Sequence, residues 1–203
     1  MKYKWLNAQN NESLIVFFNG WGMDESIVKH LEFDNFDVLM FYDYNNLDLK
    51  FNLQTLENYN NKYLIAWSMG VMVASLFKIL YNSKTAVNGT LKPIDDKYGI
   101  PEKIYDLTIK GFNTKSANLF IQKMYNNTTG IPTINRDLEN IKNELSALKN
   151  YNADMQFSYN KVIISDNDKI IPTRNQVNFW GQKPNIKEGH CPFNSFHKWS
   201  NLL

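Results

Sequence analysis

Short apolar runs separated by helical patterns are the feature that most constrains the fold of this chain. Residues 14–18, Leu-Ile-Val-Phe-Phe, form a strand-like run that is apolar on both faces and ends in the turn signal Asn19-Gly20-Trp21-Gly22. Strands of that kind belong in parallel sheets, because helices cover both faces of such sheets. The run therefore predicts a central strand that leads directly into a loop.

Similar runs alternate with helical patterns along the chain. We expect further strands over residues 37–42, 62–66, 85–88 and 161–165, with a sixth short strand before Gly189. Helices are expected over 24–31, with Asp24 as N-cap, and over 69–80, 173–180 and 195–203. Alternating strands and helices call for right-handed crossovers. The prediction is an α/β fold with a doubly wound, mostly parallel sheet.

The stretch of about 91–158 departs from this rhythm. It carries helical patterns near residues 101–110, 114–125 and 136–149 and no clear strand between them. A chain of 203 residues is close to the length of one domain, for which ~150 residues is a soft prior. We therefore expect a single domain over 1–203, with a small helical lid inserted at about 91–158.

Composition and charge exclude several classes of partner and ligand. Twenty-two Lys and Arg against 20 Asp and Glu leave a net charge of +2, and the basic residues do not cluster as in nucleic-acid binders. The single cysteine, Cys191, excludes an internal disulfide and a zinc site built from several thiolates. No apolar run approaches a signal peptide or a membrane span. We expect a cytoplasmic monomer.

The motif with the clearest chemical meaning is Ala66-Trp67-Ser68-Met69-Gly70, which lies where a predicted strand turns into a helix. A serine at such a junction fits the nucleophile elbow, where a sharp strained turn exposes the hydroxyl and requires small neighbours. Gly70 and Ala66 are small, although the usual pattern has glycine at both positions. The alternative is that Ser68 only caps the following helix. We favour Ser68 as nucleophile.

A serine nucleophile needs a base, and the base needs an acid that orients it. In this type of fold the two follow the serine in the order acid, then histidine, after later strands. His190 follows a predicted strand and a glycine, whereas His197 lies in the predicted closing helix and His30 precedes the serine. We favour His190 over His197. For the acid we favour Asp168 over Asp166, and both alternatives stay open.

Attack on an ester also needs donors for the developing oxyanion. The backbone N–H of Met69, directly after the serine, is one candidate. The loop after the first long strand supplies the other, and we favour Trp21 in Asn19-Gly20-Trp21-Gly22. Cys191 occupies no elbow and is expected to be a small buried side chain. We find no metal-ligand spacing and no phosphate-binding glycine loop, so we expect neither metal nor cofactor.

Taken together, these residues resemble the α/β-hydrolase superfamily, and within it the BioG-type pimeloyl-acyl-carrier-protein methyl ester esterases of biotin synthesis. The resemblance covers nearly the whole chain. Its specific segments are Phe-Asn-Gly-Trp-Gly at 18–22, Phe-Tyr-Asp-Tyr at 41–44, Ala-Trp-Ser-Met-Gly-Val at 66–71, Ala-Val-Asn-Gly-Thr at 86–90, Gly-Ile-Pro at 99–101, Asp-Lys-Ile at 168–170 and Glu-Gly-His at 188–190.

The resemblance implies an α/β-hydrolase fold with Ser68, His190 and Asp168 as triad and Trp21 and Met69 at the oxyanion hole. It implies hydrolysis of the methyl ester of a pimeloyl chain on acyl carrier protein, which is then the expected partner. The predicted lid carries seven Lys and Arg against five Asp and Glu over 101–150, a small excess for an acidic carrier. The alternatives are an esterase or thioesterase for free short acyl esters, and an inactive hydrolase fold that only binds.

Overall fold

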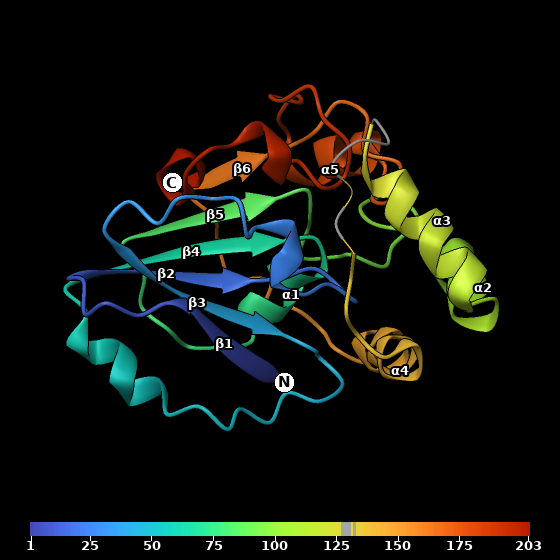
Figure 1. Ribbon diagram of the computed structural model, residues 1–203. Coiled ribbons are helices and arrows are strands. Elements are labelled where there is room, and N and C mark those ends of the chain that lie inside the picture. The colour runs from blue at the N-terminus through green and yellow to red at the C-terminus, as the bar shows by residue number, and fades with distance from the viewer. Residues whose placement is uncertain (127–130, 132) are drawn as a thin grey trace.

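One six-stranded sheet forms the centre of the computed structural model, which describes residues 1–126, 131 and 133–203 (Figure 1). The strand order is β1-β3-β2-β4-β5-β6, and β2 to β6 run parallel while β1 pairs antiparallel with β3. Their bounds are Lys2–Asn7 (β1), Ser13–Phe18 (β2), Phe36–Tyr42 (β3), Asn61–Trp67 (β4), Ser83–Val87 (β5) and Lys161–Ile163 (β6). The predicted α/β class with a mostly parallel sheet is confirmed.

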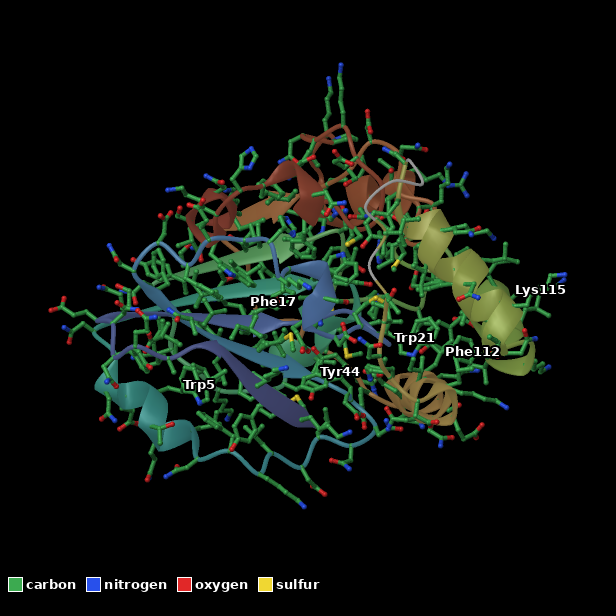
Figure 2. All side chains as sticks on the ribbon, in the orientation of Figure 1. Trp5, Phe17, Trp21, Tyr44, Phe112 and Lys115 are labelled. Atoms are coloured by element: carbon green, nitrogen blue, oxygen red, sulfur yellow. The ribbon has the colours of Figure 1, made fainter. Side chains whose placement is uncertain are left out.

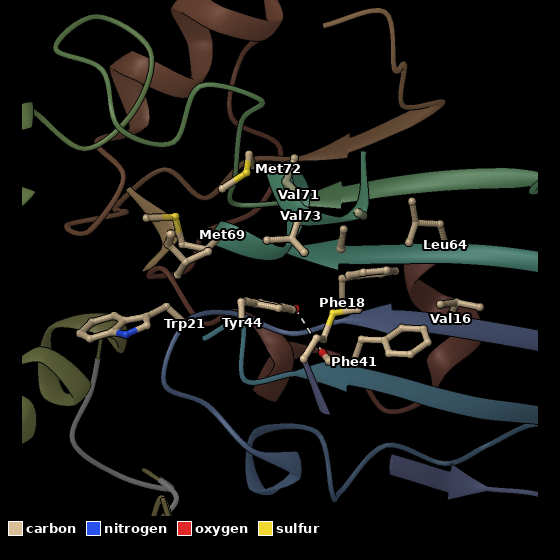
Figure 3. Close-up of a cluster of buried hydrophobic side chains, with 14 of the residues drawn as sticks. Val16, Phe18, Trp21, Phe41, Tyr44, Leu64, Met69, Val71, Met72 and Val73 are labelled. Carbon is tan, nitrogen blue, oxygen red and sulfur yellow. Dashed lines mark hydrogen bonds between the residues drawn. The ribbon is translucent and has the colours of Figure 1, made fainter. Parts of the chain in front are cut away.

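Alternate residues of each central strand fill two separate cores, one on each face of the sheet. On β2, Val16 and Phe18 pack on the face covered by helix α1 (Met69–Ala74), as Figure 3 shows. Ile15 and Phe17 point to the other face, against short 3₁₀ segments near the C-terminus. Both faces are thus buried, which explains why this strand reads as a continuous apolar run.

The order of the strands determines where a site can form. From β2 the chain moves to β3 on one side and then crosses to β4 on the other, so the direction reverses between β2 and β4. Loops at such a reversal diverge and leave a crevice at the carboxyl ends of the strands. The two loops start close together before they diverge. A Cβ placed on Gly20, after β2, would lie 3.3 Å from the Cβ of Ser68, after β4.

Three helices lie beyond the carboxyl ends of the parallel strands (Figure 1). They are α2 (Glu102–Lys110), α3 (Thr114–Met124) and α4 (Leu138–Leu148), all between β5 and β6, as the sequence predicted. Residues 127–130 and 132 of the predicted insertion lie outside the described part of the chain. Helix α5 (Thr173–Trp180) follows β6 with the predicted bounds. Within the described ranges, no helix combines the length and the apolar character needed to cross a bilayer.

The structure differs from the sequence prediction at β1 and at the end of α1. Strand β1 was not predicted: it is an edge strand paired with β3 alone, and because none of its residues is buried it lacks the apolar run that marks the central strands. Helix α1 ends at Ala74 instead of residue 80. There the hydroxyl of Ser75 donates to the carbonyl of Met72, the chain turns, and Leu80 is 88% exposed.

Three further elements are shorter than predicted. The strand expected before Gly189 is a single bridge between Ser165 and Ile186. The closing helix is two 3₁₀ segments, Phe193–Ser195 and Trp199–Leu202, and the helix over 24–31 is a 3₁₀ segment, Glu25–Ile27, with Asp24 as its N-cap. Tertiary packing, in which Phe193 and Trp199 contact the ring of Phe17, governs these segments more than helix propensity does.

Candidate active site

Ser68 stands at the turn between β4 and α1 in a strained backbone conformation. Its φ is +57° and its ψ is −123°, a combination that costs a non-glycine residue about 1–3 kcal/mol. The side chain makes no capping hydrogen bond to helix α1. The capping alternative for Ser68 therefore does not describe this residue, whose hydroxyl points to His190 instead.

The small neighbours of Ser68 are required by close contacts. A Cβ on Gly70 would lie 2.3 Å from the carbonyl oxygen of Phe18 and 2.6 Å from that of Asn19, so only glycine fits without a backbone shift. Ala66 is fully buried in β4, aligned with Phe18 of β2 and Ala86 of β5. The sheet interior thus accommodates the methyl group that replaces the usual glycine.

Three side chains from three loops form one hydrogen-bonded line. The Nε2 atom of His190 lies 2.8 Å from the Oγ of Ser68, and its Nδ1 lies 2.7 Å from the Oδ2 of Asp168. All three side chains are buried. With Nδ1 donating its proton to Asp168, Nε2 is free to accept the proton of the serine hydroxyl. The arrangement can activate the hydroxyl for attack on a carbonyl carbon.

The other candidates lie elsewhere. Asp166 is exposed, and its backbone N–H donates to the carbonyl of Ile186. His197 is exposed near the C-terminus, and Nε2 of His30 lies 3.0 Å from the carbonyl oxygen of Phe193. The structure therefore brings Asp168 and His190 to the serine, and not Asp166, His197 or His30.

The carboxylate of Asp168 is fixed by four donors. The backbone N–H groups of Ile170 and Ile171 donate to Oδ1 at 2.8 and 3.0 Å. The side-chain amide of Gln176 donates to Oδ2 at 2.8 Å, beside the bond to His190. Gln176 lies on α5, so that helix helps to set the orientation of the acid, a role that sequence reasoning missed.

Two residues to which the sequence analysis gave no individual role hold the histidine loop. The indole Nε1 of Trp67 and the amide Nδ2 of Asn88 both donate to the carbonyl oxygen of His190, at 2.8 and 2.9 Å. Asn88 also donates to the carbonyl of Gly189 and accepts from the backbone N–H of Ser165. An asparagine at the carboxyl end of a parallel strand was the signal that could have identified this residue.

The two expected oxyanion donors line the same cavity as Ser68 and His190. Among the hydrogen bonds of the described residues, none is donated by the backbone N–H of Trp21 or of Met69. The ring of Trp21 is separately engaged, since its Nε1 donates to the carbonyl of Ile141 at 2.8 Å and the ring packs in T-shaped contacts with Phe112 and Phe120. Figure 2 shows Trp21 and Phe112 together between the sheet and helices α3 and α4.

The cavity over Ser68 has a volume of about 320 Å³ and mainly apolar walls from α2 and α3. Small-molecule sites commonly measure ~300–1,000 Å³. The apolar wall residues from these helices and the loops beside them are Ile100, Ile104, Leu107, Phe112, Leu119, Phe120 and Met124. The site can therefore take an extended acyl chain whose ester carbonyl lies at the serine.

Cys191 follows the histidine directly but does not join the hydrogen-bonded line. Burial raises the pKa of its thiol to about 12. The thiol therefore stays protonated at neutral pH and is a poor nucleophile. Within the described residues, no group of three or more His, Cys, Asp and Glu side chains is arranged to hold a metal ion.

The family model described as pimeloyl-ACP methyl esterase BioG matches residues 1–202 of the chain. A Haemophilus influenzae protein is 34% identical over 217 residues, which cover 100% of this chain and 99% of that protein. The crystal structure of BioG from Haemophilus influenzae superimposes with a TM-score of 0.91 at 33% identity, over 100% of this chain and 99% of the other.

A Bacteroides fragilis protein named malonyl-[acyl-carrier protein] O-methyltransferase is 35% identical over 180 residues. This match covers 82% of the present chain, which spans only 36% of the Bacteroides protein. An esterase from Thermogutta terrifontis is similar in fold alone, with a TM-score of 0.65 at 14% identity over 94% of this chain and 86% of its own. The expected α/β-hydrolase fold is confirmed, and the chain belongs to the BioG family of carboxylic ester hydrolases.

Proposed function

We propose that this esterase hydrolyses the methyl ester of a pimeloyl chain carried by acyl carrier protein, with Ser68, His190 and Asp168 as its catalytic triad. The observation that carries the chemistry is the buried line of hydrogen bonds from Ser68 Oγ through His190 to Asp168. The description of the matching family supports the substrate.

The reaction runs in two steps. Ser68 Oγ attacks the ester carbonyl carbon while His190 Nε2 takes its proton, and the N–H groups of Trp21 and Met69 stabilise the oxyanion. Collapse of this intermediate breaks the bond to the methoxy group, which leaves as methanol with the proton from His190. Water then attacks the acyl-enzyme in the same way, which frees the carboxylic acid and regenerates Ser68. Asp168 stabilises the imidazolium in both steps.

We further propose that the chain is one domain, in which the helices of the segment 91–158 cover the site as a lid. The segment leaves the sheet after β5 and returns at β6, the neighbouring strand. Ile104 and Leu107 on α2 and Leu119 on α3 are about half-exposed although they line the cavity. Apolar side chains at a cavity rim suit an acyl chain that passes from the site to a carrier outside.

Charge supports an acidic carrier as partner. Helices α2 and α3 carry Lys103, Lys110, Lys115 and Lys123 against Glu102 and Asp106, and Asp106 is already paired with Lys149. Lys115 extends from α3 into solvent in Figure 2. The name of the Bacteroides relative, an O-methyltransferase for a carrier-bound acyl group, fits a substrate whose methyl ester is made on the carrier.

The first test is Ser68→Ala. We expect loss of ester hydrolysis with an unchanged circular dichroism spectrum and melting temperature. Hydrolysis by Ser68→Ala at the wild-type rate would refute Ser68 as nucleophile. The alternative of an inactive fold that only binds predicts that the wild-type chain hydrolyses no ester.

The second test compares the pimeloyl-carrier methyl ester with a small free methyl ester at low and high salt. The double variant Lys110→Glu/Lys115→Glu, at exposed lysines outside the cavity lining, is expected to lower kcat/KM for the carrier substrate about 3- to 10-fold at low salt and to leave the free ester unaffected. Lys78→Glu, an exposed lysine after α1, is the matched control. Equal kcat/KM on both substrates, insensitive to salt, would favour an esterase for free short esters.

A further inference from the structure

A buried carboxylate contacts the loop of residues 19–22 after β2 (the oxyanion loop) and has no part in the mechanism described so far. Glu144 lies on α4 with 0% of its surface exposed. Its Oε1 accepts from the backbone N–H of Tyr44 at 2.9 Å, and its Oε2 accepts from the backbone N–H of Gly22 at 3.2 Å and from Nη1 of Arg136 at 2.7 Å. Burial raises the pKa of Glu144, and the charge of Arg136 opposes this.

The charge of Glu144 is balanced within the core. The side chain of Arg136 is only 6% exposed, and its Nη2 donates to Asn140 at 2.6 Å and lies 3.4 Å from Asp43. Lys2 pairs with Asp43 at 2.8 Å. Buried ion pairs of this kind add little stability compared with apolar side chains of similar volume. Stability alone therefore gives no reason for a charged side chain at this place in α4.

The same helix holds the oxyanion loop at a second point. The side chain of Ile141, three residues before Glu144, lies on the same face of α4. The backbone carbonyl oxygen of Ile141 accepts a hydrogen bond from the indole Nε1 of Trp21 at 2.8 Å. Gly22 has a φ of +72°, and a Cβ there would lie 3.0 Å from Cγ2 of Ile141. Helix α4 thus fixes the ring of Trp21 and the peptide that follows it. In Figure 3 Trp21 and Tyr44 lie at the end of the buried cluster toward which the strands point.

We propose that Glu144 is a positioning residue, which holds the peptide between Trp21 and Gly22 so that the backbone N–H of Trp21 points to the oxyanion. This inference rests on the proposed function, since it presumes Ser68 as nucleophile and Trp21 as donor. Glu144 touches no reacting atom and acts through the loop. The donor must be aligned before the charge develops, because a preorganised donor is what lowers the barrier.

The substitution Glu144→Gln removes this function with minimal change in shape. A carboxylate accepts at both oxygens, whereas an amide must turn its NH₂ toward either Tyr44 N–H or Gly22 N–H, which are both donors. One of the two bonds is necessarily lost, and Arg136 loses its ion pair. The matched control is Glu139→Gln, an exposed position in the first turn of the same helix.

The readouts separate positioning from general stability. We expect Glu144→Gln to lower kcat about 10- to 100-fold, less than the loss of a whole oxyanion donor, with KM within twofold of the wild-type value. An alkyl boronic acid, which forms a tetrahedral adduct with the serine, is expected to bind more weakly by the same factor. Glu139→Gln should leave all three quantities unchanged.

A kcat within twofold of the wild type, or a fall in kcat without a parallel loss of boronate affinity, would overturn the inference. If Glu144→Gln does not fold, Trp21→Phe tests the attachment of the same loop to α4, because it loses the bond to Ile141 together with part of the indole ring. Its expected effect is a smaller parallel loss of kcat and boronate affinity, and unchanged values would count against positioning by α4. Ser68→Ala in the same assays tests the proposed function separately. If Ser68→Ala keeps its activity, the proposed function is wrong. If Ser68→Ala is inactive but Glu144→Gln keeps its activity, only the inference about Glu144 is wrong.

Discussion

Helices α3 and α4 are both 11 residues long and both belong to the segment between β5 and β6, but they are attached to the site in different ways. Helix α4 buries Ile141, Glu144, Leu145 and Leu148 and forms polar bonds to the oxyanion loop. Helix α3 buries only Ala117 and Met124, and its exposed Leu119 lines the cavity rim.

The difference suggests two functional regions. In the proposed reaction, the sheet edge and α4 are a frame that sets the positions of the reacting groups, and α2 and α3 are a wall for the acyl chain. Changes in the frame should act mainly on kcat, and changes in the wall mainly on KM. Each prediction below tests this division.

The largest effect is expected for Gly70→Ala at the elbow. The new Cβ would lie 2.3 Å from the carbonyl oxygen of Phe18, so β2 or the elbow must move. Overpacking of this kind costs about 1–3 kcal/mol of stability, and misplacement of Ser68 by ~1 Å costs about 100-fold in kcat. Thermal unfolding and steady-state kinetics measure both.

The control is Gly181→Ala, where φ is +69° and no atom lies within 4 Å of the added Cβ. It should lose about 1–2 kcal/mol of stability with kcat unchanged. A kcat for Gly70→Ala as high as that of this control would contradict the role of the elbow.

A smaller effect on kcat is expected for Asn88→Ala. The change removes the hydrogen-bond partner of the buried N–H of Ser165 and of the carbonyl of Gly189. Each unsatisfied group lowers the free energy of unfolding by about 1–3 kcal/mol. The loop that carries His190 should then shift, with a fall in kcat of about 10-fold and little change in KM. Asn178→Ala, an exposed asparagine that also bonds a backbone carbonyl, is the control. An effect confined to KM would place Asn88 with the wall instead of the frame.

A change in the wall should give the opposite pattern. Leu107→Ser removes half-exposed apolar surface at the cavity rim, at about 1–2 kcal/mol of acyl-chain contact. We expect KM for the pimeloyl substrate to rise about 5- to 30-fold, with kcat within twofold. Leu80→Ser, at an exposed position away from the cavity, should change neither. A kcat defect in Leu107→Ser would argue against the division into frame and wall.

The smallest effect is expected at Cys191. Because burial raises the pKa of its thiol to about 12, the thiol stays protonated up to that pH, whereas in the unfolded chain it ionises near pH 8.5. Iodoacetamide at pH 8.5 should therefore leave folded enzyme unlabelled and active, and should label it in 8 M urea. Rapid inactivation of the folded enzyme, prevented by substrate, would show a reactive thiol at the site.

Local patterns sufficed to predict much of the fold and the side chains that the structure brings together at the candidate site. The apolar run at β2, the three helices α2 to α4 and the bounds of α5 follow from periodicity, and the strand-to-helix junction points to Ser68. The order of serine, acid and histidine along the chain points to Asp168 and His190, which the structure brings beside the serine. Each motif lies within a few residues of sequence, although the order of the three motifs spans the 122 residues from Ser68 to His190.

The features that were missed depend on contacts between distant segments. Edge strand β1 does alternate exposed lysines with aromatic residues, a period-2 signal that was present but outweighed by the polar residues after it. No local pattern shows that Glu144 contacts Gly22, because 122 residues separate them. The same holds for Asn88 and His190. Such residues emerge only when the packed core brings the two segments together.

The claim that the hydroxyl of Ser68 is activated by His190 is tested most directly by covalent labelling. An alkyl fluorophosphonate, which reacts with activated serines, is incubated with wild type, Ser68→Ala and His190→Ala, and the modified peptide is identified by mass spectrometry. We expect one adduct per chain, on Ser68, that is absent in Ser68→Ala and forms at least 100-fold more slowly in His190→Ala. An adduct on another residue, or equal labelling of Ser68 in His190→Ala, would contradict the account.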